Sequence, residues 1–150
     1  MKRLFALLVL CVVAFCATAQ KRKATAEPEG YKFTIVNEVP ATPVKDQSRS
    51  GTCWSFSGNG LLESELLRLG KGEYDLSEMW IVRQSYIDKA EKYVRMHGKI
   101  EFACGGAFFD VFNVIQKYGI VPGEVYGGKN YGYDSHNHAE LDNVLAGYMN

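Results

Sequence analysis

The sequence predicts a mostly helical domain that is organised around one buried central helix. Apolar side chains cover more than half of the circumference of the segment from Cys53 to Leu69, as in a helix that is buried between layers. Ser77 is placed to cap a second, amphipathic helix. A third amphipathic segment stops at Gly119 with Pro122 just beyond, which is the usual order of helix stop signals.

Helical periodicity also predicts which side chains these helices bury. The central helix is expected to bury an apolar surface made of Trp54, Phe56, Leu61, Leu62, Leu66, Leu67 and Leu69. The second helix is expected to lie on the surface and to pack through Trp80, Tyr86, Ile87, Ala90, Tyr93 and Val94. The third is expected to bury Phe108, Val111, Phe112, Ile115 and Tyr118. A last amphipathic segment begins near His138 and carries Leu141, Val144, Leu145 and Tyr148.

Two glycines, Gly58 and Gly60, lie inside the predicted central helix. Each costs about 1 kcal/mol of helix stability relative to alanine. Close approach of another part of the backbone would explain why glycine stands at both positions.

The composition is that of an ordinary globular protein. The 150 residues include 17 basic and 17 acidic side chains, and 47% of the residues are hydrophobic. This is enough material for one domain with a core. Because there is no basic excess, we expect no nucleic-acid partner. We expect no cofactor either.

Residues 1–19 have the three-part layout of a secretory signal peptide. A basic start at Lys2 and Arg3 precedes an unbroken apolar run, and a small-x-small site ends at Ala19. We therefore expect cleavage after Ala19 and a secreted or periplasmic protein. The alternatives are an uncleaved N-terminal anchor and a lipid anchor on Cys11 or Cys16.

The next part of the chain is expected to be extended. Residues 20–43 are interpreted as a leader and an extended arm, in which Tyr31 to Val39 alternates enough for a short strand or an arm. Pro40 and Pro43 disfavour helix in the residues before them.

Only Cys53 and Cys104 follow the predicted signal peptide, so a multi-disulfide scaffold is excluded. The two could form a single bridge, which would consume both thiols. The alternative is that Cys53 is a nucleophile, because a cysteine at a helix N-terminus is favoured as the thiolate. Gln47 lies six residues earlier, across a loop made compact by Gly51. Its amide could join the Cys53 backbone N–H as a second donor to an oxyanion.

These residues resemble the active-site segment of the papain-like cysteine peptidases. The resemblance rests on Gln47, Gly51, Cys53, Trp54, Phe56 and Ser57, on Leu76-Ser77-Glu78, and on Cys104-Gly105-Gly106. The stretch from Lys117 to Pro122 and the later Tyr126 resemble the bleomycin hydrolase and aminopeptidase C branch in particular.

The resemblance implies an α+β fold with two domains, of which this chain covers mainly the helical left-hand domain around its central buried helix. It implies that Cys53 is the catalytic nucleophile and that Gln47 is the oxyanion donor. It implies that Gly105 and Gly106 bind the substrate backbone and that Trp54 packs behind the site. The implied partner is a peptide substrate, and a homo-oligomer is expected if the chain follows the bleomycin hydrolase branch.

The chain departs from the family pattern in two ways. Ser50 and Ala103 stand where papain has its first disulfide, so that bridge is expected to be absent. The second departure concerns the catalytic histidine and asparagine that the resemblance implies. In papain-like enzymes the histidine lies roughly 130–150 residues after the cysteine, so both residues are expected beyond Asn150.

The available histidines are His97, His136 and His138. We interpret His97 as a solvated residue at a helix end. We place the other two in a polar loop, where they are poor candidates for a base. With Cys104 they offer too few ligands for zinc.

Residues 44–150 are therefore expected to be the N-terminal, Cys-bearing part of a peptidase domain that is truncated at its C-terminus. On its own this part is expected to be inactive. The expected function is cysteine-type peptidase activity, with aminopeptidase-like action. The alternatives are an inactive, peptidase-derived module that binds peptides, and acyl transfer by the same residues, against which the Gln47 spacing and the glycine pair argue.

Overall fold

The computed structural model describes residues 30–129 and 132–149. The predicted signal peptide lies outside these residues. The chain divides after Val36 into two units, and the helices and sites discussed below all lie in the second. Of the two alternatives for Tyr31 to Val39, a short strand or an extended arm, the strand is not formed, because the segment has neither helix nor strand.

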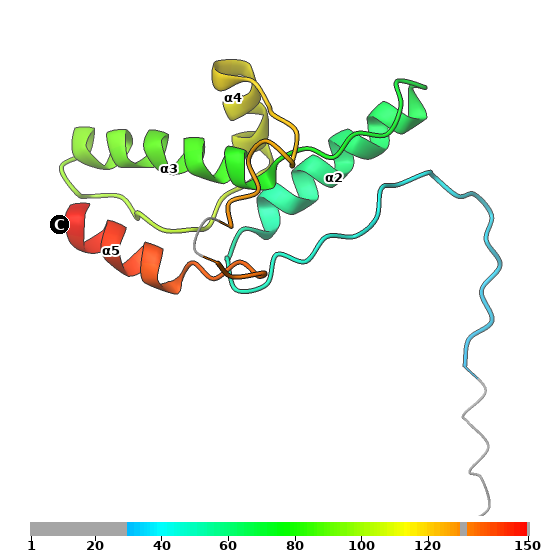
Figure 1. Cartoon of the computed structure of the whole chain (residues 1–150), viewed down its shortest axis with the longest axis horizontal. Coiled ribbons are helices and arrows are strands. Elements are labelled where there is room, and N and C mark those ends of the chain that lie inside the picture. Colours follow the sequence, from blue (N-terminus) through cyan, green and yellow to red (C-terminus); the bar gives the residue numbers. More distant parts are fainter. Residues whose placement is uncertain (1–29, 130–131, 150) are drawn as a thin grey trace, which may run out of the picture. The chain divides into compact units, whose positions relative to one another are not determined.

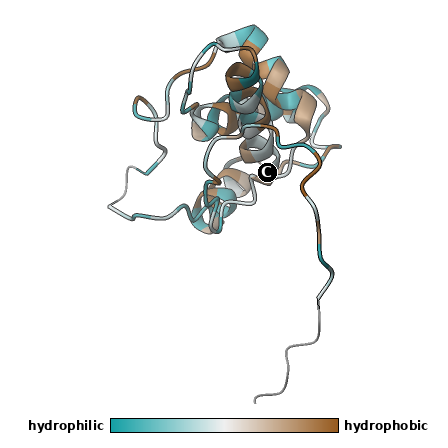
Figure 2. Cartoon of the chain, turned by 90° about the vertical axis from the view of Figure 1, so that its right-hand side faces the viewer, coloured by the Kyte–Doolittle hydropathy of each residue, from teal (hydrophilic) through white to brown (hydrophobic). Residues whose placement is uncertain are grey.

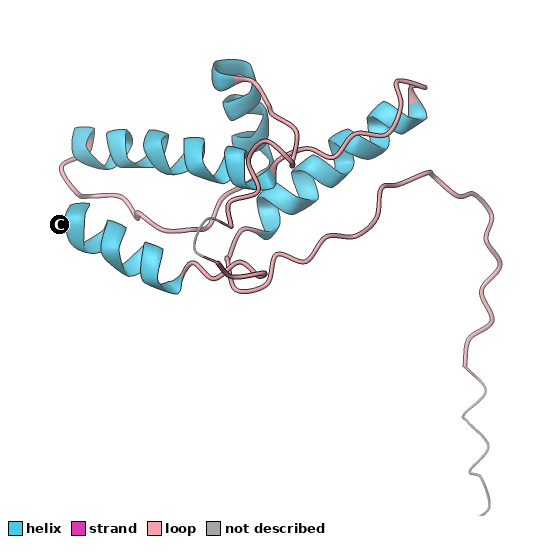
Figure 3. Ribbon diagram, in the orientation of Figure 1, coloured by secondary structure: helices cyan, strands magenta, loops and turns pink. Residues whose placement is uncertain are grey.

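The second unit is built from four helices (Figure 1). They are α2 (Cys53–Arg68), α3 (Glu78–Arg95), α4 (Phe108–Tyr118) and α5 (Ala139–Met149). Within the described residues the β-structure is limited to two isolated bridges, Arg49 with Asn137 and Leu76 with Pro122 (Figure 3). The α+β expectation is thus met here only in its helical part.

The predicted helix boundaries at Cys53, Ser77 and Gly119 are confirmed. α2 starts at Cys53 itself. The Ser77 hydroxyl accepts a hydrogen bond from the Trp80 backbone N–H at 2.9 Å, as an N-cap residue should. Gly119 ends α4 with a φ of 75°, a left-handed value that glycine adopts without strain.

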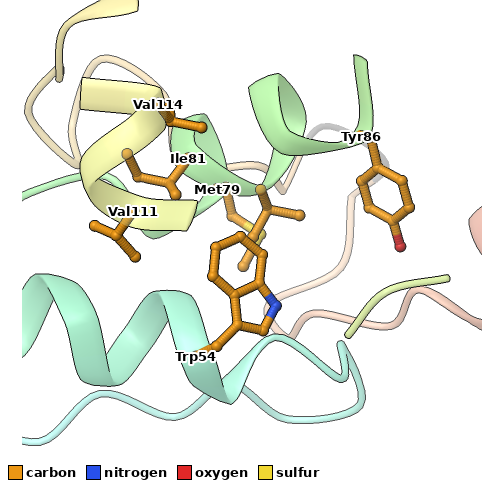
Figure 4. Close-up of a cluster of buried hydrophobic side chains, with 7 residues drawn as sticks. Trp54, Met79, Ile81, Tyr86, Val111 and Val114 are labelled. Carbon is orange, nitrogen blue, oxygen red and sulfur yellow. The ribbon is translucent and has the colours of Figure 1, made fainter. Parts of the chain in front are cut away.

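The core forms where α2, α3 and α4 meet (Figure 4). Its buried apolar side chains are Trp54, Met79, Ile81, Val82, Tyr86, Val111 and Val114. Trp54 rises from the start of α2 toward Met79 and Ile81, with Val111 and Val114 contributed by α4. Trp54, Tyr86 and Val111 were predicted. Figure 2 shows hydrophobic and hydrophilic segments around the same helices, as amphipathic packing requires.

The predicted buried faces of α3 and α4 are wrong in part. α4 buries Val111 and Val114, whereas Phe108 and Phe112 are 42% and 40% exposed. These two rings instead pack edge-on against each other, with centroids 4.8 Å apart. In α3 only the N-terminal half enters the core, so Ile87 stays exposed.

The buried face of α2 differs most from the prediction, because its most buried positions are largely polar. Ser55, Asn59 and Glu63 are completely or almost completely buried, and they repeat every four residues along one face. Leu61 and Leu69, which were predicted to be buried, are 48% and 57% exposed. The physical reason is visible in Figure 1, where the C-terminal half of α2 extends away from α3 and α4.

The two glycines of α2 turn out to differ. A Cβ built on Gly58 would lie 2.6 Å from a methyl carbon of Val111, so α4 approaches α2 closely there. A Cβ on Gly60 meets no atom within 4 Å. The close-approach explanation is therefore confirmed for Gly58, with a side chain rather than backbone as the neighbour, and is wrong for Gly60.

No helix among residues 30–129 and 132–149 combines the length and the apolar character that crossing a membrane requires.

We predict opposite effects for alanine at these two positions. Gly58→Ala should lower the free energy of unfolding by about 1–3 kcal/mol, because overpacking against Val111 outweighs the gain in helix propensity. Gly60→Ala should raise it by up to about 1 kcal/mol, because only the propensity gain remains. Urea unfolding of the two variants measures both values, and equal shifts would contradict the packing of α4 on Gly58.

Candidate functional site

The candidate site lies at the N-terminus of α2. Cys53 is the first residue of the helix, and its thiol is exposed and free. The Thr52 carbonyl accepts hydrogen bonds from Ser55 and Phe56, which begins the helical ladder. Among the described residues, the backbone N–H groups of Cys53 and Trp54 have no acceptor. These groups are the unpaired donors that every helix N-terminus presents.

The loop before Cys53 is held in a tight conformation. The Asp46 carboxylate accepts a hydrogen bond from the Ser48 N–H at 2.7 Å, and Ser48 itself has a φ of 50°. The hydroxyls of Ser50 and Thr52 are buried and lie 2.5 Å apart. Gly51 has a φ of 66°, which confirms that this glycine makes the loop compact.

Cys104 packs against this loop. A Cβ on Gly51 would lie 2.6 Å from the Cys104 sulfur, so only glycine fits there. Both Cys53 and Cys104 are free thiols in the structure, so the alternative of a bridge between them is not observed.

Gln47 and Cys53 line the same hollow, which has a volume of about 380 Å³. The hollow extends along α2 past Phe56 and Ser57 to Glu63. The structure thus brings the predicted oxyanion donor and the predicted nucleophile to one concave surface. The side-chain amide of Gln47 and the free N–H of Cys53 are available there for a negatively charged oxygen.

The segment that carries Gln47 is anchored by Lys45. The Lys45 ammonium contacts carboxylate oxygens of Glu63 at 2.9 Å, Glu78 at 2.8 Å and Asp75 at 2.5 Å. Although burial lowers the pKa of Lys45, the hydrogen bonds to these three carboxylates raise it above its ordinary value. Lys45 therefore stays charged and ties the segment before the site to both α2 and α3.

Among the three carboxylates that contact Lys45, that of Glu63 is the most buried. Its carboxylate also accepts hydrogen bonds from the Thr42 hydroxyl at 2.6 Å and from the Leu76 N–H at 2.7 Å. A buried carboxylate is stable only when such partners satisfy its oxygens. The partners come from two chain segments far apart in sequence, so Glu63 joins the segment before the site to the segment that leads into α3.

The segment of the glycine pair, Gly105 and Gly106, contacts Trp54, the residue after Cys53. A Cβ on Gly106 would lie 2.5 Å from the indole ring of Trp54, whereas a Cβ on Gly105 would meet no atom within 4 Å. The indole N–H also donates to the Cys104 carbonyl at 3.0 Å. Trp54 is 7% exposed and directly follows Cys53, so it packs between the thiol-bearing helix start and the glycine pair.

His136 and His138 lie in a loop, as predicted, but they are buried in it. Both rings are buried, with 8% exposure each, and their centroids lie 6.3 Å apart. The backbone around them forms a bridge with the loop before Cys53: the Arg49 N–H donates to the His136 carbonyl at 3.0 Å, and the His138 N–H donates to the Arg49 carbonyl at 3.1 Å. The segment 136–138 therefore holds the loop that precedes Cys53.

Neither histidine is placed to serve as a base for Cys53. His136 packs its ring edge-on against Phe56, at 6.1 Å between centroids, and no histidine of the described residues lines the hollow of Cys53. His97 is exposed in the turn after α3, as predicted. The same part of the chain holds no group of three side chains that could bind a metal ion.

Burial lowers the pKa of both histidines. At His136 the positive charge of Lys129 and the neighbouring His138 add to this effect, and Asp46 opposes it. At His138 the carboxylate of Asp142 and a hydrogen bond to the Ser50 backbone oppose the burial. Both rings are therefore neutral at neutral pH.

An exposed thiol at a helix N-terminus can act as a nucleophile, and a side-chain amide in the same hollow can stabilise an oxyanion. Comparison with known proteins gives the family. Residues 31–146 match the family model described as "Papain family cysteine protease", and the chain belongs to that family.

Similar proteins carry related names. The chain is 25% identical over 116 residues to "Cysteine proteinase 1, mitochondrial" of Saccharomyces cerevisiae, an alignment that covers 66% of this chain and 24% of that protein. It is 35% identical over 95 residues to "Cathepsin L-like peptidase" of Aedes aegypti, with 63% and 24% covered. It is 25% identical over 120 residues to "Bleomycin hydrolase" of Oryctolagus cuniculus, with 67% and 43% covered. The chain thus spans about a quarter of the length of the yeast and mosquito relatives.

Sequence reasoning missed the residues that hold the site in place. Lys45 and Glu63 were not singled out, although Ser55, Asn59 and Glu63 form a polar stripe at four-residue spacing inside an apolar helix. That stripe was a usable signal, because most buried polar groups have hydrogen-bond partners. Ser55 and Glu63 have such partners, whereas the Asn59 amide has none among the described residues.

We predict that acidification weakens the hold of segment 136–138. The folded state binds a proton on these histidines more weakly than the unfolded chain, whose ordinary histidine pKa is 6.5. Stability is therefore complete above that value and falls as pH drops through it toward the lowered folded-state pKa.

Urea unfolding between about pH 8 and pH 5 measures this dependence. A His136→Gln, His138→Gln double variant should show a flatter profile, while His97→Asn, which changes the exposed histidine, should keep the native slope. If the double variant keeps the native dependence of stability on pH, His136 and His138 are not its source.

Proposed function

We propose that the full-length protein is a cysteine peptidase in which Cys53 attacks the scissile carbonyl of a peptide. One observation carries the proposal: Cys53 presents its exposed thiol at the first residue of α2, in the hollow that Gln47 also lines. Gln47 and the Cys53 backbone N–H stabilise the oxyanion of the tetrahedral intermediate. The developing negative charge then lies at the positive end of the α2 dipole.

The substrate is a peptide bound in extended form along the glycine pair. Gly106 is exposed, and among the described residues no hydrogen bond engages its backbone N–H or C=O. An extended main chain can pair with such a backbone edge. Gly105 lies beside it, and Trp54 supports this edge from the helix that carries Cys53.

The general base comes from outside residues 30–129 and 132–149. The backbone of His136 and His138 holds the loop before Cys53, and neither side chain lines the hollow of Cys53. His97 lies exposed in the turn after α3. The yeast and mosquito relatives are about four times longer than the aligned part of this chain, which supports the proposal that a longer protein supplies the histidine and asparagine.

Within the family we propose the bleomycin hydrolase and aminopeptidase C branch, with aminopeptidase-like action. Support comes from the similarity to the rabbit protein named bleomycin hydrolase, together with the stretch from Lys117 to Pro122 and Tyr126 in the sequence. The sequence features of a signal peptide support a secreted or periplasmic location for this enzyme.

A second candidate function is a peptide-binding module that does not cut its ligand. It is favoured by one specific observation: the Gly106 edge is fully formed within the described residues, whereas no histidine lines the hollow of Cys53. The two functions differ in turnover, so the same experiment separates them.

The test is hydrolysis of aminoacyl and peptidyl fluorogenic reporters by the full-length protein. Cys53→Ala should abolish turnover, and Gln47→Ala should lower kcat by about 10²–10³, the usual cost of one oxyanion donor. Gln116→Ala, which changes an exposed glutamine of α4, is the matched control and should be silent. Turnover that survives in Cys53→Ala rejects the peptidase mechanism, and peptide binding without turnover in the native protein favours the binding module.

A further inference from the structure

Lys89 holds the backbone that leads into the glycine pair. This lysine lies on α3, and its ammonium donates hydrogen bonds to the carbonyl of Ala103 at 3.1 Å and to the carbonyl of Gly105. Bonds from a charged donor are stronger than bonds between neutral groups. One side chain thus ties two carbonyls of the segment before Gly106 to the middle of α3.

Trp54 binds the carbonyl of Cys104, which lies between the carbonyls of Ala103 and Gly105 in the chain. Its indole N–H donates to Cys104 at 3.0 Å, and the Lys89 ammonium lies 5.4 Å from the centre of the Trp54 ring. That distance is within the range of a cation–π interaction. Lys89 and Trp54 therefore act together, because they bind three successive carbonyls and also contact each other.

Gly106 is the first residue after the three bound carbonyls whose own backbone groups form no hydrogen bond within the described residues. The carbonyls of residues 103, 104 and 105 are all bound, whereas within the described residues neither backbone group of Gly106 has a partner. Gly106 also lies against the Trp54 ring, where any Cβ would clash. The position of the free edge is thus fixed by Lys89 through Trp54 and the neighbouring carbonyls.

The main partners of the Lys89 ammonium are the carbonyls of Ala103 and Gly105. The nearby carboxylates have partners of their own: Asp110 accepts from the Ala107 N–H at 2.7 Å, and Asp142 accepts from the Tyr86 hydroxyl. Lys89 also lies 5.6 Å from the centre of the Tyr86 ring. Burial lowers its pKa, and the charges of Asp110 and Asp142 oppose that change.

We propose that Lys89 is a positioning residue for substrate, which fixes the Gly106 edge so that it can pair with the main chain of an extended peptide. Lys89 does not touch the reacting atoms and acts through Trp54 and the carbonyls of Ala103 and Gly105. The inference rests on the proposed function in one respect only, since it takes the Gly106 edge as the place where peptide binds.

The test separates peptide binding from catalysis. In full-length protein that carries Cys53→Ala, the affinity for a hexapeptide of Phe and Ala, fluorescein-labelled at its C-terminus, is measured by anisotropy. Lys89→Met should weaken binding at least about tenfold, the usual loss when a charged hydrogen-bond donor is removed. Lys89→Arg should restore part of the affinity, because arginine also donates to carbonyls and stacks on indole. Lys92→Met, an exposed lysine on the same helix, should have no effect.

The second readout is alkylation of Cys53 by iodoacetamide, a small reagent that does not bind to the Gly106 edge. The rate at which iodoacetamide alkylates Cys53, followed by mass spectrometry of the Cys53 peptide, should be the same in Lys89→Met and in the native protein. Unchanged peptide affinity in Lys89→Met overturns the inference. A parallel fall of affinity, alkylation rate and thermal midpoint also overturns it, because Lys89 would then support the fold in general.

The proposed function can fail separately. If the protein with Cys53 intact binds the hexapeptide in a Lys89-dependent way and never cleaves it, peptidase activity is rejected while the role of Lys89 stands. If the Cys53→Ala protein does not bind the hexapeptide at all, the edge and the role of Lys89 are both rejected.

Discussion

The buried carboxylate of Glu63 is the constraint on which the rest of the site depends. A carboxylate with 1% exposure is tolerated only if its oxygens are satisfied, and here Lys45, Thr42 and the Leu76 N–H satisfy them. These partners bring the segment around Lys45 and the segment before α3 onto the polar face of α2. The position of Gln47, two residues after Lys45, follows from that attachment.

Around this anchor, each part of the candidate site is held from a different element. The loop before Cys53 is bridged by segment 136–138, and the glycine pair is held by Trp54 and Lys89. The thiol itself stands at the exposed start of a helix whose next residue is buried in the core. A side chain that is exposed while its neighbours are fixed can be held in one geometry, as positioned catalysis requires.

Sequence patterns predicted the local features and missed the long-range ones. The start of α2 at Cys53, the cap at Ser77 and the stop at Gly119 depend on nearby residues, and all three were predictable. The partners of Glu63 and the burial of His136 depend on segments that are distant along the chain. A helical wheel cannot show such partners, and it overestimated the apolar burial of α2 for the same reason. The free edge at Gly106 required the contact with Trp54 to be seen.

The central claim is that Lys45 and Glu63 act as one unit, and a double-mutant cycle tests it most directly. Lys45→Met, Glu63→Gln and the double variant are compared by urea unfolding, with the exposed pair of Arg68 and Glu65 as the reference cycle. We expect a coupling above about 1 kcal/mol for Lys45 and Glu63, as for contacting residues in one buried network. We expect less than that for the exposed pair. Additive effects of Lys45→Met and Glu63→Gln, within about 0.3 kcal/mol, would contradict the account.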